Sequence, residues 1–318
     1  MAKKIEERIK QLRQLRTAAT DAEAEPTLIK ALEDKSGLVV AEAAKTIGER
    51  HSVRLIPNLL AAYTRMFEHP VQSDPKCRAK AAIVKALTAL DYEEAAPFLR
   101  ASTYVQMEPV YGGQEDSAAP LRACAILALV QCTDLTRGEI LRHLVDSLAD
   151  EADPVRVEAV RALEQMNGEE AALLLRLKAH SFDTRSAVLG QVFDSILALE
   201  RDRAVDFVAK FLESDIEEAR DEAALSLGAS RLPGAVRILI EAWHASPHSL
   251  LLRALSSSRD ETALAFLLNL VRDGITRDAA AALEALKLHA ESPEIQARVD
   301  QARLDRTAAG KSAIPPTR

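Results

Sequence analysis

The side chains best suited to metal binding or acid–base chemistry are seven histidines, and they are scattered along the chain. They are His51, His69, His143, His180, His244, His248 and His289. His244 and His248 are four residues apart, as two metal ligands on one helix would be, but Pro247 interrupts a helix between them. No acid or cysteine completes a ligand set around this pair. The histidines therefore predict no metal centre.

Nucleotide-binding and nucleophile motifs are also missing from the sequence. Gly310-Lys311-Ser312 resembles the end of a phosphate-binding loop, but it lacks the upstream glycine and the preceding strand that such a loop requires. The Gly-x-Ser-x-Gly pattern of serine hydrolases does not occur. We therefore expect no catalytic residue, no cofactor and no enzyme activity.

A different kind of chemistry, recognition of a partner, is suggested by the distribution of tyrosine. All four tyrosines lie between positions 63 and 111, and two of them fall in the segment 104–116, which also holds Gly112-Gly113. This segment is predicted to be an inserted loop without secondary structure, and long loops of that kind are often functional. A plainer interpretation stays open, in which the segment is a decorated turn whose tyrosines pack on their own helices.

The candidate partner-binding residues combine tyrosines, nearby acids and two arginines, which are residue types that contribute strongly to protein interfaces. They are Tyr63, Arg65, Tyr104, Glu108, Tyr111, Gly112, Gly113, Glu115, Asp116 and Arg122. In this interpretation the acids meet a basic or peptide surface of a protein partner.

Charge and cysteine content narrow the classes of partner and the expected compartment. The formal net charge is −7, and residues 1–17 alone carry +4, so the other 301 residues carry −11. An acidic body makes nucleic acid an improbable ligand. No uncharged run is long enough to span a membrane. Cys77, Cys124 and Cys132 lie in apolar helical contexts, as reduced core thiols do, so we expect a cytoplasmic protein.

The elements that must position these residues are predicted to be almost entirely helical. The 318 residues include 56 alanines and 43 leucines, both strong helix formers, but only 11 glycines and 13 prolines. A pattern of two helices joined by a short acidic turn recurs with a period near 34 residues. Its clearest copy runs from Ile140 to Met166, where the turn contains Asp153-Pro154 and the second helix carries Arg156. Small residues follow three positions after the place of Arg156 in most copies, which allows helices to approach closely.

This arrangement resembles the HEAT-repeat family, in its short bacterial form, over roughly residues 20–290. The turn aspartate of the family is matched by Asp153 and Asp74, and less cleanly by Asp116 and Asp183; its second-helix arginine is matched by Arg78, Arg122, Arg156, Arg185 and Arg220. The last two repeats lack the arginine. The resemblance implies an all-α, right-handed α-solenoid (an armadillo-type superhelix) of about eight antiparallel helix pairs. We expect the arginines to hydrogen-bond to turn aspartates of neighbouring repeats.

The repeat pattern predicts a single domain over residues 1–307. Its N-terminal capping helix covers residues 1–17, its C-terminal capping helix covers 293–307, and 308–318 form a flexible tail. The predicted helix pairs are 22–49, 53–90, 93–131, 137–166, 169–199, 202–229, 233–257 and 260–289.

The leading functional hypothesis is a non-enzymatic scaffold or adaptor that binds a protein through a curved solenoid face and the loop 104–116. Two alternatives stay open. Short HEAT-like repeats also occur in phycobilin lyases, so a lyase-like or chaperone-type subunit is one. A DNA-binding or DNA-glycosylase-like solenoid is the other, although it would need a basic face and aromatic residues around the target base. The paired His-Glu motifs of HEAT-type iron hydroxylases are absent.

Overall fold

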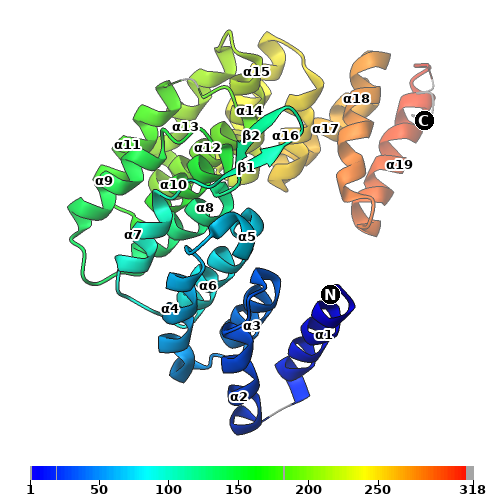
Figure 1. Cartoon of the computed structure of the whole chain (residues 1–318). Helices are drawn as coiled ribbons and strands as arrows, with labels where there is room; N and C mark the ends of the chain where they lie inside the picture. Colours follow the sequence, from blue (N-terminus) through cyan, green and yellow to red (C-terminus); the bar gives the residue numbers. More distant parts are fainter. Residues whose placement is uncertain (1, 19, 182, 313–318) are drawn as a thin grey trace. The chain divides into compact units, whose positions relative to one another are not determined.

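Helices dominate the part of the chain that the structure describes. The computed structural model describes residues 2–18, 20–181 and 183–312, and Figure 1 labels its elements in chain order. The chain divides into two compact units, Met1–Met166 (unit 1) and Asn167–Arg318 (unit 2). Each unit is described by itself below.

Unit 1 consists of helix pairs interrupted by one β-hairpin. Its elements are α1 (Ala2–Ala18), α2 (Asp21–Leu32), α3 (Gly37–Glu49), α4 (Ile56–Arg65), α5 (Pro70–Ser73), α6 (Arg78–Ala89), α7 (Ala96–Ser102), β1 (Met107–Val110), β2 (Gly113–Asp116), α8 (Ala119–Ala128), α9 (Arg137–Ser147) and α10 (Asp153–Met166). Short 3-10 turns cover Val53–Leu55, Pro75–Cys77 and Leu129–Gln131.

Helix α1 and the second helices of successive pairs in unit 1 form a continuous row. Helix α1 packs on α3, α3 on α6, α6 on α8 and α8 on α10. Small side chains explain how close these helices lie: Ala43, Ala79 and Ala125 are fully buried. A Cβ added at Gly48 would lie 3.2 Å from the Cα of Ala86, so the glycine permits the contact between α3 and α6. The row buries leucine, isoleucine and valine from both helices of each pair, which supplies the hydrophobic stabilisation.

Unit 2 repeats the same plan with shorter interruptions. Its helices are α11 (Glu169–His180), α12 (Ser186–Glu200), α13 (Asp202–Ala209), α14 (Glu217–Ser230), α15 (Pro233–Ala245), α16 (Ser249–Ser258), α17 (Glu261–Asp273), α18 (Thr276–Leu286) and α19 (Pro293–Ala308), with 3-10 turns at Lys210–Glu213 and Lys287–His289. Helices α12, α14, α16 and α18 pack on one another in sequence, and α19 packs on α17. Trp243 on α15 is buried in this unit.

The eight helix pairs of the described chain confirm the predicted fold class. Helices α1 and α19 lie within one residue of the two predicted capping helices. The predicted tail begins where α19 ends, and its residues 313–318 lie outside the described residues. The assignment of residues 1–307 to a single domain stays a prediction.

The segment 104–116 differs from its prediction, because most of it is regular. Strands β1 and β2 pair antiparallel, with Met107 opposite Asp116 and Val110 opposite Gly113. Tyr111 and Gly112 form the two-residue connection, and Gly112 has a φ of +90°, which glycine adopts without strain. The prediction of a loop without secondary structure is therefore wrong for residues 107–116. A sequence pattern dominated by helical periodicity obscured so short a hairpin.

Candidate functional site

The β-hairpin of unit 1 exposes several large apolar side chains. Tyr111 at its tip has a relative accessibility of 109%, and Val105, Met107 and Val110 are 46–56% exposed. Gly112 and Gly113 have open space on the side where a Cβ would lie. Glu115 on β2 is also exposed. Apolar surface gathered on one projecting element is typical of an interaction site.

The base of the hairpin is held by hydrogen bonds to Glu108 on β1. Its carboxylate accepts hydrogen bonds from the hydroxyl of Ser117, the backbone N–H of Lys76 and the side-chain amide of Gln106. Desolvation opposes ionisation of Glu108, but these hydrogen bonds and the charge of Lys76 outweigh it and lower the pKa of Glu108. The residue that sequence analysis offered to a partner is thus already bonded within the chain.

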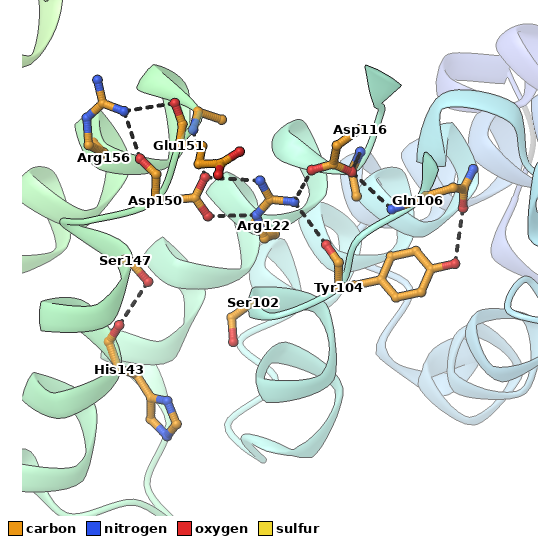
Figure 2. Close-up of polar contacts among 12 residues, drawn as sticks. Ser102, Tyr104, Gln106, Asp116, Arg122, His143, Ser147, Asp150, Glu151 and Arg156 are labelled. Carbon is orange, nitrogen blue, oxygen red and sulfur yellow. Dashed lines mark hydrogen bonds and ion pairs between the residues drawn. The ribbon is translucent and has the colours of Figure 1, made fainter. Parts of the chain in front are cut away.

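Asp116 and Arg122 close the other side of the base, as Figure 2 shows. Asp116 accepts hydrogen bonds from the backbone N–H groups of Gln106 and Ala118 and forms an ion pair with Arg122. Desolvation opposes ionisation of Asp116 as well, and its pKa is lowered because these hydrogen bonds and the guanidinium outweigh that effect. Arg122 is only 6% exposed, and it also donates to the backbone carbonyl of Tyr104.

The guanidinium of Arg122 reaches the next repeat, where it binds both carboxylate oxygens of Asp150 at 2.8 and 3.0 Å (Figure 2). This confirms, for Arg122, the expected bond to a neighbouring turn aspartate. Arg156 instead binds the aspartate of its own turn, Asp153, and carbonyl oxygens of the same turn, and Arg220 donates to a carbonyl oxygen of its own turn. The expectation is wrong for Arg78, which is exposed and has no hydrogen-bond acceptor among the described residues.

Tyr104 and Tyr63 belong to a packed aromatic row in unit 1. The ring of Phe67 makes edge contacts with Tyr63 at 4.9 Å and with Tyr104 at 4.8 Å between centroids. Tyr63 is buried, and its hydroxyl donates to the carbonyl oxygen of Pro97 at 2.9 Å. Burial raises the pKa of both tyrosines. The structure thus places these two rings inside the packing and leaves Tyr111 as the exposed tyrosine of the hairpin.

Arg65 lies at the end of a neighbouring helix. Its guanidinium donates to the carbonyl oxygens of Leu32 and Glu33, where α2 ends. These carbonyls have no partner within the helix, so Arg65 satisfies them and joins α4 to α2. It does not contribute to the exposed surface of the hairpin.

A fully buried ion pair, which sequence analysis did not foresee, stands beside the aromatic row. The Lys80 ammonium lies 3.0 Å from Asp74, and both side chains have an accessibility of 0%. Asp74 also caps α6 by accepting the N–H groups of Ala79 and Lys80, while Lys80 donates to the carbonyl of Met66. The amide of Gln106 donates to the backbone carbonyl of Asp74 and so connects the hairpin to this cap. The burial of Lys80 could not be predicted, because lysine in an alanine-rich helix is usually exposed.

In the ranges that the structure describes, no three His, Cys, Asp or Glu side chains are grouped so that they could hold a metal ion. None of the described helices combines the length and apolar character that crossing a membrane demands. Cys77, Cys124 and Cys132 are free thiols, and burial raises the pKa of Cys77 to about 11.

Comparisons with known proteins find only distant structural similarities. No family model and no curated protein matches the chain. Among solved structures, the chain is similar to YIBA_ECOLI (17% identity, TM-score 0.48, covering 87% of this chain and 96% of that one) and to human deoxyhypusine hydroxylase in complex with glycerol (22% identity, TM-score 0.30, covering 80% and 88%). It is also similar to an engineered protein (17% identity, TM-score 0.34, covering 95% and 87%). The described elements themselves define a helical-repeat protein with one inserted hairpin.

Proposed function

We propose that the chain is a non-enzymatic, cytoplasmic scaffold of the HEAT-repeat type, and that it binds another protein through the hairpin of unit 1. The observation that carries this proposal is the exposure of Val105, Met107, Val110 and Tyr111 on an element whose base is fixed. Leaving these side chains in water is unfavourable, and burying them against a partner would remove that cost. Tyrosine adds a large contact area with few rotatable bonds.

The rigid base strengthens the proposal because ordering a flexible loop on binding costs free energy. Glu108 is bonded to Lys76, and Arg122 joins Asp116 to Asp150, so the base of the hairpin is anchored to the body of unit 1. Glu108, Asp116 and Arg122 therefore act as supports, and the contact residues are the exposed apolar side chains between positions 105 and 111. Exposed apolar side chains on a projecting hairpin would fit an apolar pocket on the partner.

The test is quantitative affinity purification of the full chain from its native source, comparing a hairpin variant with a matched control. The hairpin variant is Val110→Ser/Tyr111→Ser. The control is Leu177→Ser, which removes an apolar side chain that is 67% exposed on α11 of unit 2. We expect a protein that co-purifies with the wild type and the control to be reduced at least about tenfold with the hairpin variant, as for interface hot spots. Equal recovery with all three proteins would overturn the proposal.

A further inference from the structure

A groove in unit 1 borders the hairpin and has a floor of small apolar residues. Its volume is about 760 Å³, which is within the usual range of ligand-binding pockets. Helices α1, α3 and α6 line it, together with Pro120 at the start of α8. Ala41, Ala82 and Ala89 form part of its floor, and Leu38 is 42% exposed at its side. Such a floor allows the backbone of a bound segment to approach closely.

The charge of the groove is opposite to the charge of the chain. Its lining holds five basic residues, Arg13, Lys45, Lys76, Arg78 and Lys85, and two acidic residues, Glu42 and Glu49. The lining thus carries a formal charge of +3, from five positive and two negative groups, in a chain of net charge −7. A positive groove attracts an acidic ligand.

The positive charge is concentrated at one part of the groove. Both acids are already paired within the chain, Glu42 with Arg13 and Arg16, and Glu49 with Arg16 and Lys45. The side chains of Lys76, Arg78 and Lys85 are exposed, and no carboxylate of the described residues lies within ion-pair distance of them, although the charge of Lys76 acts on Glu108 and Lys85 interacts with Cys124. They lie on α6 or directly before it, so one ligand can meet all three.

We propose that this groove binds an acidic amphipathic helix of the partner protein. The apolar face of that helix lies on the alanine floor, and its carboxylates face Lys76, Arg78 and Lys85. An amphipathic helix in an apolar groove is a recurring mode of peptide recognition. The apolar floor favours a peptide over nucleic acid, whose phosphates would gain nothing from it.

One end of the groove adjoins the base of the hairpin. The backbone N–H of Lys76 donates to the carboxylate of Glu108 at the hairpin base, and Pro120 follows the hairpin in the chain. A partner that contacts Tyr111 can therefore extend into the groove. This inference names the chemistry of the partner and so rests on the proposed function, but it depends on different side chains.

The experiment measures binding of a fluorescein-labelled peptide to the full chain by fluorescence anisotropy. The probe is a designed amphipathic helix of about 18 residues, long enough to be helical, with glutamates on one face and leucine and alanine on the other. A second peptide replaces every glutamate with lysine, and a duplex DNA of similar length is the third probe. We expect the glutamate peptide to bind most tightly, and to bind more weakly as salt concentration rises.

The decisive variant is Arg78→Glu/Lys85→Glu, which changes two exposed side chains and should fold normally. We expect it to bind the glutamate peptide at least about fivefold more weakly. The matched control, Arg203→Glu/Arg253→Glu, reverses two exposed arginines of unit 2 and should bind like the wild type. Equal affinities of the two variants, or tighter binding of the lysine peptide or of DNA, would overturn the proposal.

The hairpin variant Val110→Ser/Tyr111→Ser separates this inference from the proposed function. It should bind the isolated glutamate peptide as the wild type does, because the peptide occupies the groove alone. If no acidic peptide binds while capture of the native partner still depends on the hairpin, only the groove proposal fails. If the peptide binds and capture does not depend on the hairpin, only the hairpin proposal fails.

Discussion

Unit 2 is stabilised by regular packing between its second helices. Its second helices touch through small residues, and a Cβ added at Gly228 on α14 would lie 2.2 Å from the carbonyl oxygen of Ala254 on α16. Hydroxyl groups add hydrogen bonds across the same contacts, such as that from Ser256 to the carbonyl of Ala285 at 2.8 Å. Most positions of unit 2 are therefore explained by packing alone.

Unit 1 uses the same packing but departs from it between α4 and α8. Lys76 and Cys77 both have positive φ, Asp74 and Lys80 bury opposite charges, and a hairpin stands where unit 2 has a short turn. Each of these features lowers the stability of the fold unless neighbouring groups compensate for it. Helix packing does not require these exceptional residues of unit 1. Their contacts instead support and position the exposed surface of the hairpin.

The largest expected effect is the loss of the buried ion pair of unit 1. Lys80→Met leaves the charge of Asp74 buried without its partner, and we expect it to lower the free energy of unfolding by about 3–5 kcal/mol. Asp74→Asn/Lys80→Met removes both charges and should be less destabilising than Lys80→Met alone. Urea unfolding followed by circular dichroism measures both. A double variant less stable than the single one would show that the charges are not coupled in this way.

Close helix packing in unit 2 predicts the next largest effect. Gly228→Ala places a methyl group against backbone atoms of α16 that cannot move independently, so we expect a loss of about 1–3 kcal/mol in the free energy of unfolding. Gly190→Ala is the control, because there the nearest atoms belong to the flexible side chain of Glu222. Thermal unfolding should separate the two variants, and equal melting temperatures would contradict the described packing.

A smaller effect is expected from Arg122→Lys at the hairpin base. Lysine cannot bind both oxygens of Asp150 while also reaching Asp116 and the carbonyl of Tyr104. We expect a loss of about 1–2 kcal/mol in local stability, the range of one or two hydrogen bonds to charged groups. Hydrogen exchange should be faster at residues 105–116 and unchanged in unit 2. Unchanged exchange at the hairpin would mean that Arg122 does not support it.

The smallest expected effect is the loss of hairpin stability at low pH. Glu108 and Asp116 have lower pKa values in the folded chain than ordinary carboxyl groups, so their ionised forms stabilise the hairpin base above about pH 4. This contribution is lost as the pH falls through the lowered pKa values. We expect hairpin amides to lose protection there, after correction for the intrinsic exchange rate. Glu108→Gln should reduce this pH dependence, whereas a variant with the same pH dependence as the wild type would exclude Glu108 as its source.

The helical elements could be predicted from sequence because their signals are local. Alanine and leucine content, turn acids such as Asp153 and a period near 34 residues each report on neighbouring positions of one helix pair. The predicted ranges therefore agree closely with α1 to α19. The segment around Tyr104 and Tyr111 is exceptional in the sequence as well, because it breaks that period.

The roles of individual residues in the site could not be predicted because they depend on distant contacts. Tyr63 and Tyr111 are the same residue type, yet one is buried against Pro97 and the other is fully exposed. Arg78 and Arg122 occupy equivalent repeat positions, and only Arg122 has carboxylates within reach. The burial of Lys80 likewise follows from where α6 packs.

The most direct test of the central claim, that unit 1 carries the binding surface, is hydrogen exchange of the full chain with and without the glutamate peptide. The account predicts slower exchange on peptide binding in α6 and at residues 74–78, with no change in α12, α14 or α16 of unit 2. Protection confined to unit 2, or saturation with peptide that leaves the exchange of α6 unchanged, would contradict it.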